Sequence, residues 1–143
     1  MTPPLPGRRV GQPGWLVREA RTMLLIDAAN VVGSRPTGWW RDRPGAAQNL
    51  TARVRRAVAD GTLPPGVVLV MEGEAKKGVD EGHADGVEVV HAAGHGDDTL
   101  VALAAKSDTP VVLVSADRQL AKRVRQSGAE VVSPTWLLDR LPS

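Results

Sequence analysis

The stretch TMLLID, residues 22–27, is a short apolar run that ends on a carboxylate. Continuous apolar runs, in contrast to alternating ones, are typical of parallel strands that are buried on both faces. The run therefore predicts the first strand of a buried parallel sheet. Similar runs, each containing valine or leucine, predict four more strands at residues 67–72, 87–92, 110–116 and 129–132.

Helical patterns alternate with these runs. Residues 45–60 carry apolar side chains at helical spacing, and Gly61 follows where a helix cap belongs. Strands that alternate with helices favour an α/β fold, with a central parallel sheet between two layers of helices. Further helices are predicted at residues 97–107, 117–128 and 133–141, the last with Ser133 as its N-cap.

The composition limits the class of protein. A chain of 143 residues fits one domain. Residues 1–20 are rich in proline, glycine and arginine without periodicity, so we expect a flexible arm before a single domain at 21–143. The absence of cysteine excludes disulfides, thiol nucleophiles and cysteine-ligated zinc. No secretory signal or membrane-length apolar run is present, so we expect a cytoplasmic protein that does not bind membranes.

Acidic residues follow several of the predicted strands. In parallel sheets, ligands bind beyond the carboxyl ends of the strands, where the winding direction reverses. Carboxylates that converge there repel one another, by about 4 kcal/mol for a pair about 4 Å apart at an effective dielectric near 20. Either a cation compensates for this repulsion, or some of the carboxylates are protonated. Oxygen ligands without thiolates suit Mg²⁺ or Mn²⁺. Each aspartate taken alone has another interpretation, since Asp97 or Asp117 can simply cap a helix.

The segments LLIDAAN, VLVMEG, GDDTL and VLVSAD occur in this order along the chain. In order and spacing they resemble the motif series of PIN-like nucleases, particularly the NYN branch, over about residues 22–141. The resemblance implies a sheet with strand order 3-2-1-4-5 and metal-dependent hydrolysis of single-stranded or structured RNA. One residue departs from the pattern, because Ala28 follows the first aspartate where the family commonly has glycine.

Each motif residue has a counterpart in this family. The resemblance matches Asp27 to the family's first strand-end aspartate, and it matches the late Ser-x-Asp element to Ser115 and Asp117. It implies that a metal ion is held by aspartates, with neutral side chains that orient them. The predicted catalytic residues are Asp27, Asn30, Glu72, Asp97, Asp98, Ser115 and Asp117, of which Asp27, Asp97, Asp98 and Asp117 are the predicted ligands of Mg²⁺ or Mn²⁺.

The segment GSRPTGWWRDRPG, residues 33–45, suggests a nucleic-acid contact. Arginines neutralise phosphates, and exposed tryptophans stack on unpaired bases. The alternative is that Trp39 or Trp40 completes a core that contains no phenylalanine or tyrosine. The predicted RNA contacts are Arg35, Trp39, Trp40, Arg41, Arg43, Lys76 and Lys77.

Two other functions remain open at this stage. One is a non-cleaving RNA-binding module of the same fold, and the other is a Mg²⁺-dependent phosphatase or nucleotide hydrolase. The latter is disfavoured because Ala29, and not a second aspartate, stands two places after Asp27. A zinc site at His91 and His95 is rejected, since flanking glycines disfavour a helix there. Homodimerisation, and a protein partner bound through the arm, stay open.

Overall fold

The computed structural model describes residues 22–143. The arm predicted at residues 1–20 lies outside the described residues. Within residues 22–143 the chain forms a mixed α/β structure, a mostly parallel sheet with helices around it. In this part of the chain, no helix is both long enough and apolar enough to cross a membrane.

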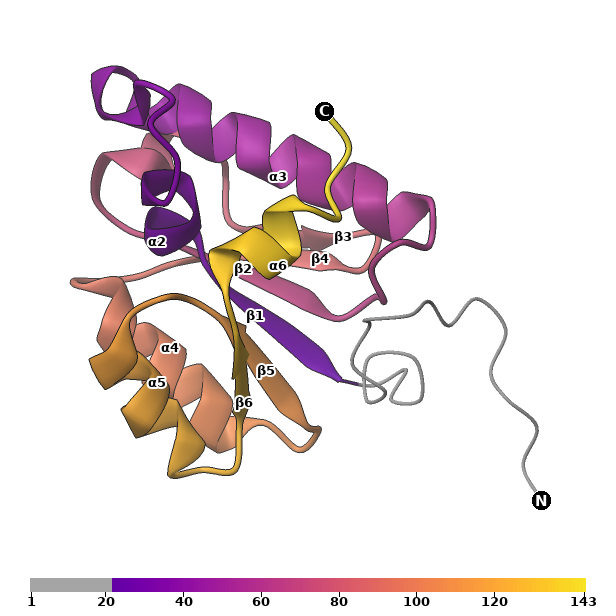
Figure 1. The fold of residues 1–143 in the computed structure, drawn as a ribbon, viewed down its shortest axis with the longest axis vertical. Helices are drawn as coiled ribbons and strands as arrows, with labels where there is room; N and C mark the ends of the chain where they lie inside the picture. Colours follow the sequence, from indigo (N-terminus) through magenta and orange to yellow (C-terminus); the bar gives the residue numbers. More distant parts are fainter. Residues whose placement is uncertain (1–21) are drawn as a thin grey trace.

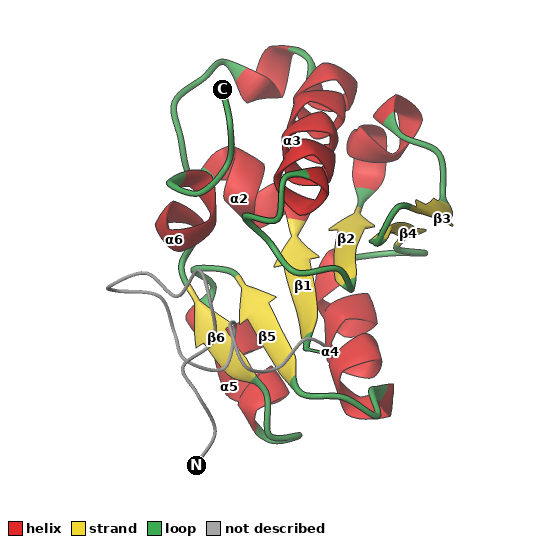
Figure 2. Ribbon diagram, turned by 90° about the vertical axis from the view of Figure 1, so that its right-hand side faces the viewer, coloured by secondary structure: helices red, strands yellow, loops and turns green. Residues whose placement is uncertain are grey.

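The sheet has six strands in the order β3-β4-β2-β1-β5-β6. Figure 2 shows the strands side by side in this order, with the carboxyl ends of β1, β2 and β5 pointing the same way. Every neighbouring pair is parallel except β3 with β4. The strands are β1 (Met23–Asp27), β2 (Val67–Met71), β3 (Gly82–Ala84), β4 (Val87–His91), β5 (Val111–Val114) and β6 (Glu130–Val132).

The observed strand order differs from the predicted 3-2-1-4-5, because β3 adds a sixth strand at one edge of the sheet. All three residues of β3 are exposed, so no apolar pattern marks the strand in the sequence. It is held instead by antiparallel pairing with β4, across a tight turn in which Asp85 and Gly86 both have positive φ. The five parallel strands lie in the order β4-β2-β1-β5-β6.

Helices cover both faces of the sheet (Figure 1). Helices α2, α3 and α6 lie on one face, and α4 and α5 lie on the other. Two further elements, for which the sequence predicts no helix, lie between β1 and the long helix α3, namely α2 and the 3-10 helix η1. The helices are α2 (Ala28–Gly33), η1 (Trp39–Arg41), α3 (Arg43–Ala59), η2 (Gly73–Gly78), α4 (Gly96–Lys106), α5 (Arg118–Arg125) and α6 (Pro134–Leu138).

The strands divide their side chains between two cores. Successive residues of a strand point to opposite faces. In β1, Leu24 and Ile26 therefore pack under α2, α3 and α6, whereas Leu25 packs in the cluster with α4 and α5. All three are fully buried, which explains the continuous apolar run in the sequence.

The predicted helix ends are confirmed at two places. Ser133 caps α6, because its hydroxyl accepts a hydrogen bond from the backbone N–H of Trp136. Gly61 lies just beyond α3 with a φ of 82°, a left-handed conformation in which glycine is favoured because it has no Cβ. These caps set where the long helix α3 ends and where the final helix begins.

Candidate active site

Three polar residues follow apolar residues that pack on the face of the sheet covered by α4 and α5. Because side chains alternate along a strand, the residue two places further on points to the same face. The apolar members are Leu25, Val70 and Leu113, and the polar residues two places beyond them are Asp27, Glu72 and Ser115. Since β1 lies between β2 and β5, these polar residues meet at one edge of the sheet, beside the start of α4.

Asp27 is the buried centre of this edge. Its side chain is only 8% exposed although it carries a carboxylate. Oδ1 accepts a hydrogen bond from the backbone N–H of Asn30 at 3.4 Å, and Oδ2 accepts one from Ser115 Oγ at 3.1 Å. Asp27 therefore caps α2 as well as standing at the end of β1.

Two neutral residues connect this carboxylate to the loop after β5. Asn30 Oδ1 accepts a hydrogen bond from the backbone N–H of Ala116 at 2.7 Å, which joins α2 to that loop. Ser115 Oγ also accepts from the backbone N–H of Asp117 at 3.1 Å. Ser115 thus connects the Asp27 carboxylate to the backbone of Asp117, and Asn30 ties α2 to the loop that carries Asp117.

Four carboxylates influence one another here, and we name Asp27, Glu72, Asp97 and Asp117 the acidic group. Burial raises the pKa of Asp27 to about 6, and the negative charges of Asp97 and Glu72 add to the rise, against hydrogen bonds that lower it. Burial also raises the pKa of Asp97, with further contributions from Asp117 and Glu72. The acidic group therefore concentrates negative charge around a buried position.

Asp98 lies apart from the acidic group. Its carboxylate is 84% exposed and forms an ion pair with Arg123, with Arg123 Nη2 at 3.0 Å from Oδ1. Asp97 and Asp98 are both in the first turn of α4. Since neighbouring residues of a helix point in directions about 100° apart, only one of them faces the sheet edge. That residue is Asp97.

The raised pKa of Asp27 predicts a pH-dependent cost in stability. The carboxyl ionises near pH 3.8 in its ordinary state and near pH 6 in the fold, so the folded protein loses stability as pH rises between these values. The cost is about 3 kcal/mol and is complete above pH 6. We expect Asp27→Asn, in metal-free buffer, to raise the free energy of unfolding at pH 8 and to change it little at pH 4. Urea unfolding of both proteins measures this, and equal stabilities at pH 8 would contradict it.

The donor set of the acidic group fits a hard divalent cation, because all its side chains offer oxygen and their charges repel. Within residues 22–143, however, no three histidine, aspartate or glutamate side chains are already arranged to hold one ion. Asp117 is engaged as the N-cap of α5, where its Oδ1 accepts from the backbone N–H groups of Gln119 and Leu120. The chemistry of the donors therefore fits an ion, while a shared coordination shell is not preformed.

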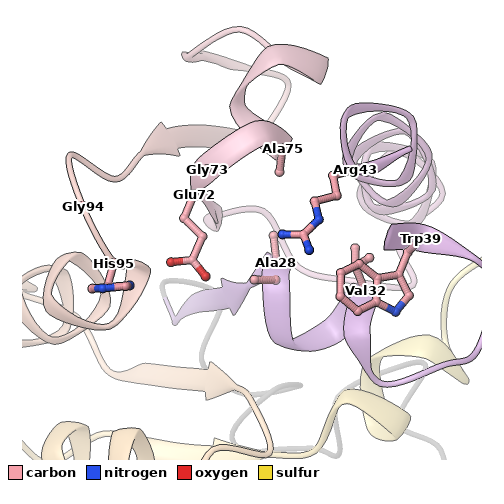
Figure 3. A pocket seen from close by; sticks show the side chains of 10 residues that line it. Ala28, Val32, Trp39, Arg43, Glu72, Gly73, Ala75, Gly94 and His95 are labelled. Carbon is pink, nitrogen blue, oxygen red and sulfur yellow. The ribbon is translucent and has the colours of Figure 1, made fainter. Parts of the chain in front are cut away.

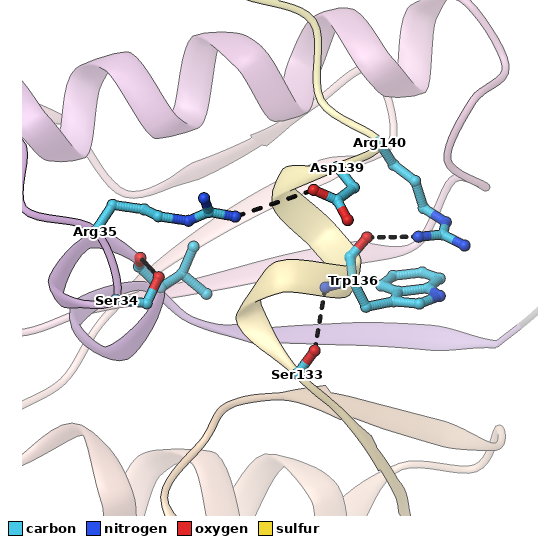
Figure 4. A network of polar contacts seen from close by, with 7 residues as sticks. Ser34, Arg35, Ser133, Trp136, Asp139 and Arg140 are labelled. Atoms are coloured by element: carbon cyan, nitrogen blue, oxygen red, sulfur yellow. Dashed lines mark hydrogen bonds and ion pairs between the residues drawn. The ribbon is translucent and has the colours of Figure 1, made fainter.

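The tryptophans and arginines predicted to contact RNA differ in exposure and in their partners. Trp40 is 52% exposed and meets Trp39 edge to face at a centroid distance of 5.9 Å. The Arg41 guanidinium lies 5.8 Å from the Trp40 ring, and that of Arg43 lies 5.2 Å from the Trp39 ring. Arg35 reaches Asp139 at 4.0 Å in a network around α6 (Figure 4). Trp39 is half-buried, whereas Trp40 is exposed. The two tryptophans predicted to stack on RNA bases therefore differ in how far solvent reaches their rings.

Lysines and histidines predicted or considered as site residues have structural partners. Lys76 Nζ donates to the carbonyl oxygen of Ala92 at 3.0 Å, which ties η2 to the end of β4. Lys77 forms an ion pair with Glu74 at 2.7 Å. His91 Nε2 contacts a backbone oxygen, that of Val79, at 2.7 Å. Each of the two lysines predicted to contact RNA therefore has a partner within the protein.

Sequence reasoning missed two features of this edge. Gly96, the first residue of α4, donates its backbone N–H to Glu72 Oε2. Helix α5, which Asp117 caps, carries exposed cations, one of which, Arg123, pairs with Asp98; the basic residues at 118–125 are visible in the sequence, but their place in the fold is not. These cations are Arg118, Lys122, Arg123 and Arg125.

Comparison with known proteins identifies a shared fold. No protein-family model matches the chain, and no curated protein matches its sequence. The solved structure of Rae1 (YacP) from Bacillus subtilis matches with a TM-score of 0.63 and 19% identity, covering 82% of this chain and 71% of that one. A mutant of the same protein gives 0.64 and 19%, over 82% and 73%. At this identity the likeness shows that the chain shares the fold of Rae1.

Proposed function

We propose that this chain is a divalent-metal-dependent ribonuclease with a PIN-like fold, which hydrolyses RNA phosphodiester bonds at the acidic group. The observation that carries the proposal is the mutual influence of four carboxylates from four separate segments, with the buried Asp27 among them. Carboxylates whose pKa values are raised by burial and by neighbouring charges gather at functional sites, and this favours a catalytic use. The order of the PIN/NYN-like motifs and the fold shared with Rae1 support the same conclusion.

Mg²⁺ or Mn²⁺ would be held by Asp27, Asp97 and Asp117, with Glu72 beside them. When bound, the ion supplies charge neutralisation at the phosphodiester and makes water a stronger nucleophile at neutral pH. Asp98 is left out of this set because its carboxylate is ion-paired with Arg123.

The protein's own residues have distinct roles in the proposed reaction. Of Asp97 and Glu72, the carboxylate that does not bind the ion would accept the proton of the attacking water. Asn30 and Ser115 are positioning residues: the Asn30 backbone N–H and the Ser115 hydroxyl donate to the Asp27 carboxylate, and the Asn30 side chain accepts from the backbone N–H of Ala116. The exposed ring of Trp40 offers a stacking surface for a base. The cations of α5 offer contacts for the phosphates on the other side of the acidic group.

The direct experiment incubates the purified chain with a single-stranded RNA, the DNA of the same sequence, and a small phosphate ester. We expect cleavage of the RNA in the presence of Mn²⁺ or Mg²⁺ and none after chelation. RNA that is bound equally tightly with and without the ion, and never cut, would support the non-cleaving module instead. Hydrolysis of the phosphate ester with intact RNA would support the phosphatase.

A further inference from the structure

A cavity of about 530 Å³ lies next to the acidic group (Figure 3). Its walls come from α2, η1, the start of α3, η2 and the loop before α4, and Glu72 is shared between the cavity and the acidic group. The volume falls within the range of roughly 300 to 1,000 Å³ that is typical of small-molecule sites. The side chains used below are Ala28, Val32, Trp39, Arg43, Glu72 and Ala75.

Three of these side chains make the cavity mainly apolar. Ala28 and Val32 come from α2, and Ala75 comes from η2. The half-buried ring of Trp39 adds an aromatic surface and packs near Gly33, where an added Cβ would be 3.7 Å from the ring. A flat aromatic ligand can therefore replace water against these walls and pack beside an indole.

Two opposite charges reach into the cavity from opposite sides. Figure 3 shows the Arg43 guanidinium and the Glu72 carboxylate extending toward one another across it. Among the described residues, no ion pair within 4.0 Å joins the two, so a space separates donor from acceptor. A ligand edge that carries both an acceptor and donors would bridge this space.

Both charged groups are held in place before any ligand binds. The Arg43 guanidinium lies over the Trp39 ring at 5.2 Å, an attraction between a cation and an aromatic face. Glu72 Oε2 accepts the backbone N–H of Gly96, and a Cβ at that glycine would lie only 3.3 Å from the same oxygen. Gly96 therefore permits the close approach that orients Glu72. Preorganised groups bind a ligand at a lower entropic cost.

Hydrogen-bonding chemistry selects among the four bases. An ionised carboxylate only accepts hydrogen bonds, and a guanidinium only donates them. Guanine presents two adjacent donors, N1–H and N2–H₂, that a carboxylate can accept together, and its O6 and N7 atoms are acceptors that suit arginine. Cytosine and adenine each offer the carboxylate one amino group, and uracil offers one N–H between two carbonyls. Glu72 and Arg43 together therefore complement guanine best.

We propose that this cavity binds an unpaired guanine base of the RNA substrate, packed beside Trp39 and held between Glu72 and Arg43. The inference rests on the proposed function for its substrate, because Glu72 places the base beside the carboxylates at which water would attack the phosphodiester. Since the edge of guanine used by Glu72 is the one that pairs with cytosine in a duplex, the guanine must be unpaired. The substrate is therefore single-stranded at this position.

Equilibrium binding of 5′-nucleotides to the full chain tests the proposal without any cleavage step. The wild-type protein is titrated in metal-free buffer with GMP, AMP, CMP, UMP and IMP, by calorimetry. We expect GMP to bind at least about tenfold more tightly than AMP, CMP or UMP, and IMP, which lacks the N2 amino group, to lose about tenfold relative to GMP. Because all five share the ribose phosphate, only the base accounts for the differences.

A pair of variants on one helix supplies the control. We expect Arg43→Met to lower GMP affinity at least about tenfold, whereas Arg55→Met, at an exposed site further along α3, leaves it unchanged. Equal affinities for the nucleotides, or no binding at millimolar concentration, would overturn the proposal. Guanine selectivity without RNA cleavage would overturn the proposed function and leave the guanine site standing. RNA cleavage without selectivity for guanine would overturn the guanine site and leave the proposed function standing.

Discussion

Replacement of Asp27 by asparagine is expected to lower the rate of RNA cleavage at least about 100-fold. Asparagine has nearly the shape of aspartate, and its side-chain oxygen can still accept a hydrogen bond from Ser115 or Asn30. The substitution therefore removes the charge at the centre of the acidic group and little else. Loss of a partner that merely supports a metal ligand already costs about 10- to 100-fold, so loss of a ligand itself costs more.

The measurement is the initial rate on single-stranded RNA at saturating Mn²⁺, compared with that of the wild-type chain. The exposed Asp108 provides the control, because Asp108→Asn removes one negative charge far from the acidic group's hydrogen bonds and should change the rate less than about twofold. Circular dichroism confirms that both variants are folded. An Asp27→Asn variant that retains more than half of the wild-type rate would show that Asp27 is not part of the catalytic centre.

Asp97 and Asp98 are expected to differ sharply although they are adjacent in the chain. Asp97 is half-buried and interacts with Asp117 and Glu72, so its charge belongs to the acidic group. Asp98 is exposed and paired with Arg123 on the surface. Exposed ion pairs contribute at most about 1 kcal/mol, so their loss leaves the fold and the site nearly intact.

We therefore expect Asp97→Asn to lose at least about 100-fold in kcat, and Asp98→Asn to change it less than about threefold. The two variants carry the same chemical change at neighbouring positions of one helix turn, so each controls for the other. Rates on one RNA at several Mn²⁺ concentrations measure the difference. The opposite ranking would show that α4 presents the other aspartate to the substrate.

The sheet was largely predictable, because its parallel strands are buried on both faces and continuous apolar runs mark such strands. Two elements were not predictable for a physical reason. Strand β3 is three exposed residues with no apolar pattern, and it exists because β4 offers a partner edge. Helix α2 spans only Ala28–Gly33, and it begins with a capping hydrogen bond from Asn30 to Asp27 in a segment too short to show helical periodicity in the sequence.

The site was predictable only at the level of strand ends. The positions of Asp27 and Ser115 follow from the end of a buried strand, and the structure joins them by a hydrogen bond. The choice between Asp97 and Asp98 depends on the rotation of α4 about its axis, which no local pattern reveals. The contacts of Lys76 and Lys77 depend on where η2 folds back, so charge alone suggested an RNA role while the structure gives each a nearby partner.

The central claim is that the acidic group holds a divalent cation, and a crystal of the protein soaked in Mn²⁺ tests it most directly. Anomalous scattering identifies the position of manganese independently of any assay of activity. The account predicts a peak bonded to Asp27 and to at least one of Asp97 and Asp117, with Asp98 still paired with Arg123. A saturated crystal with no peak at this edge of the sheet, or with manganese bound only elsewhere, would contradict it.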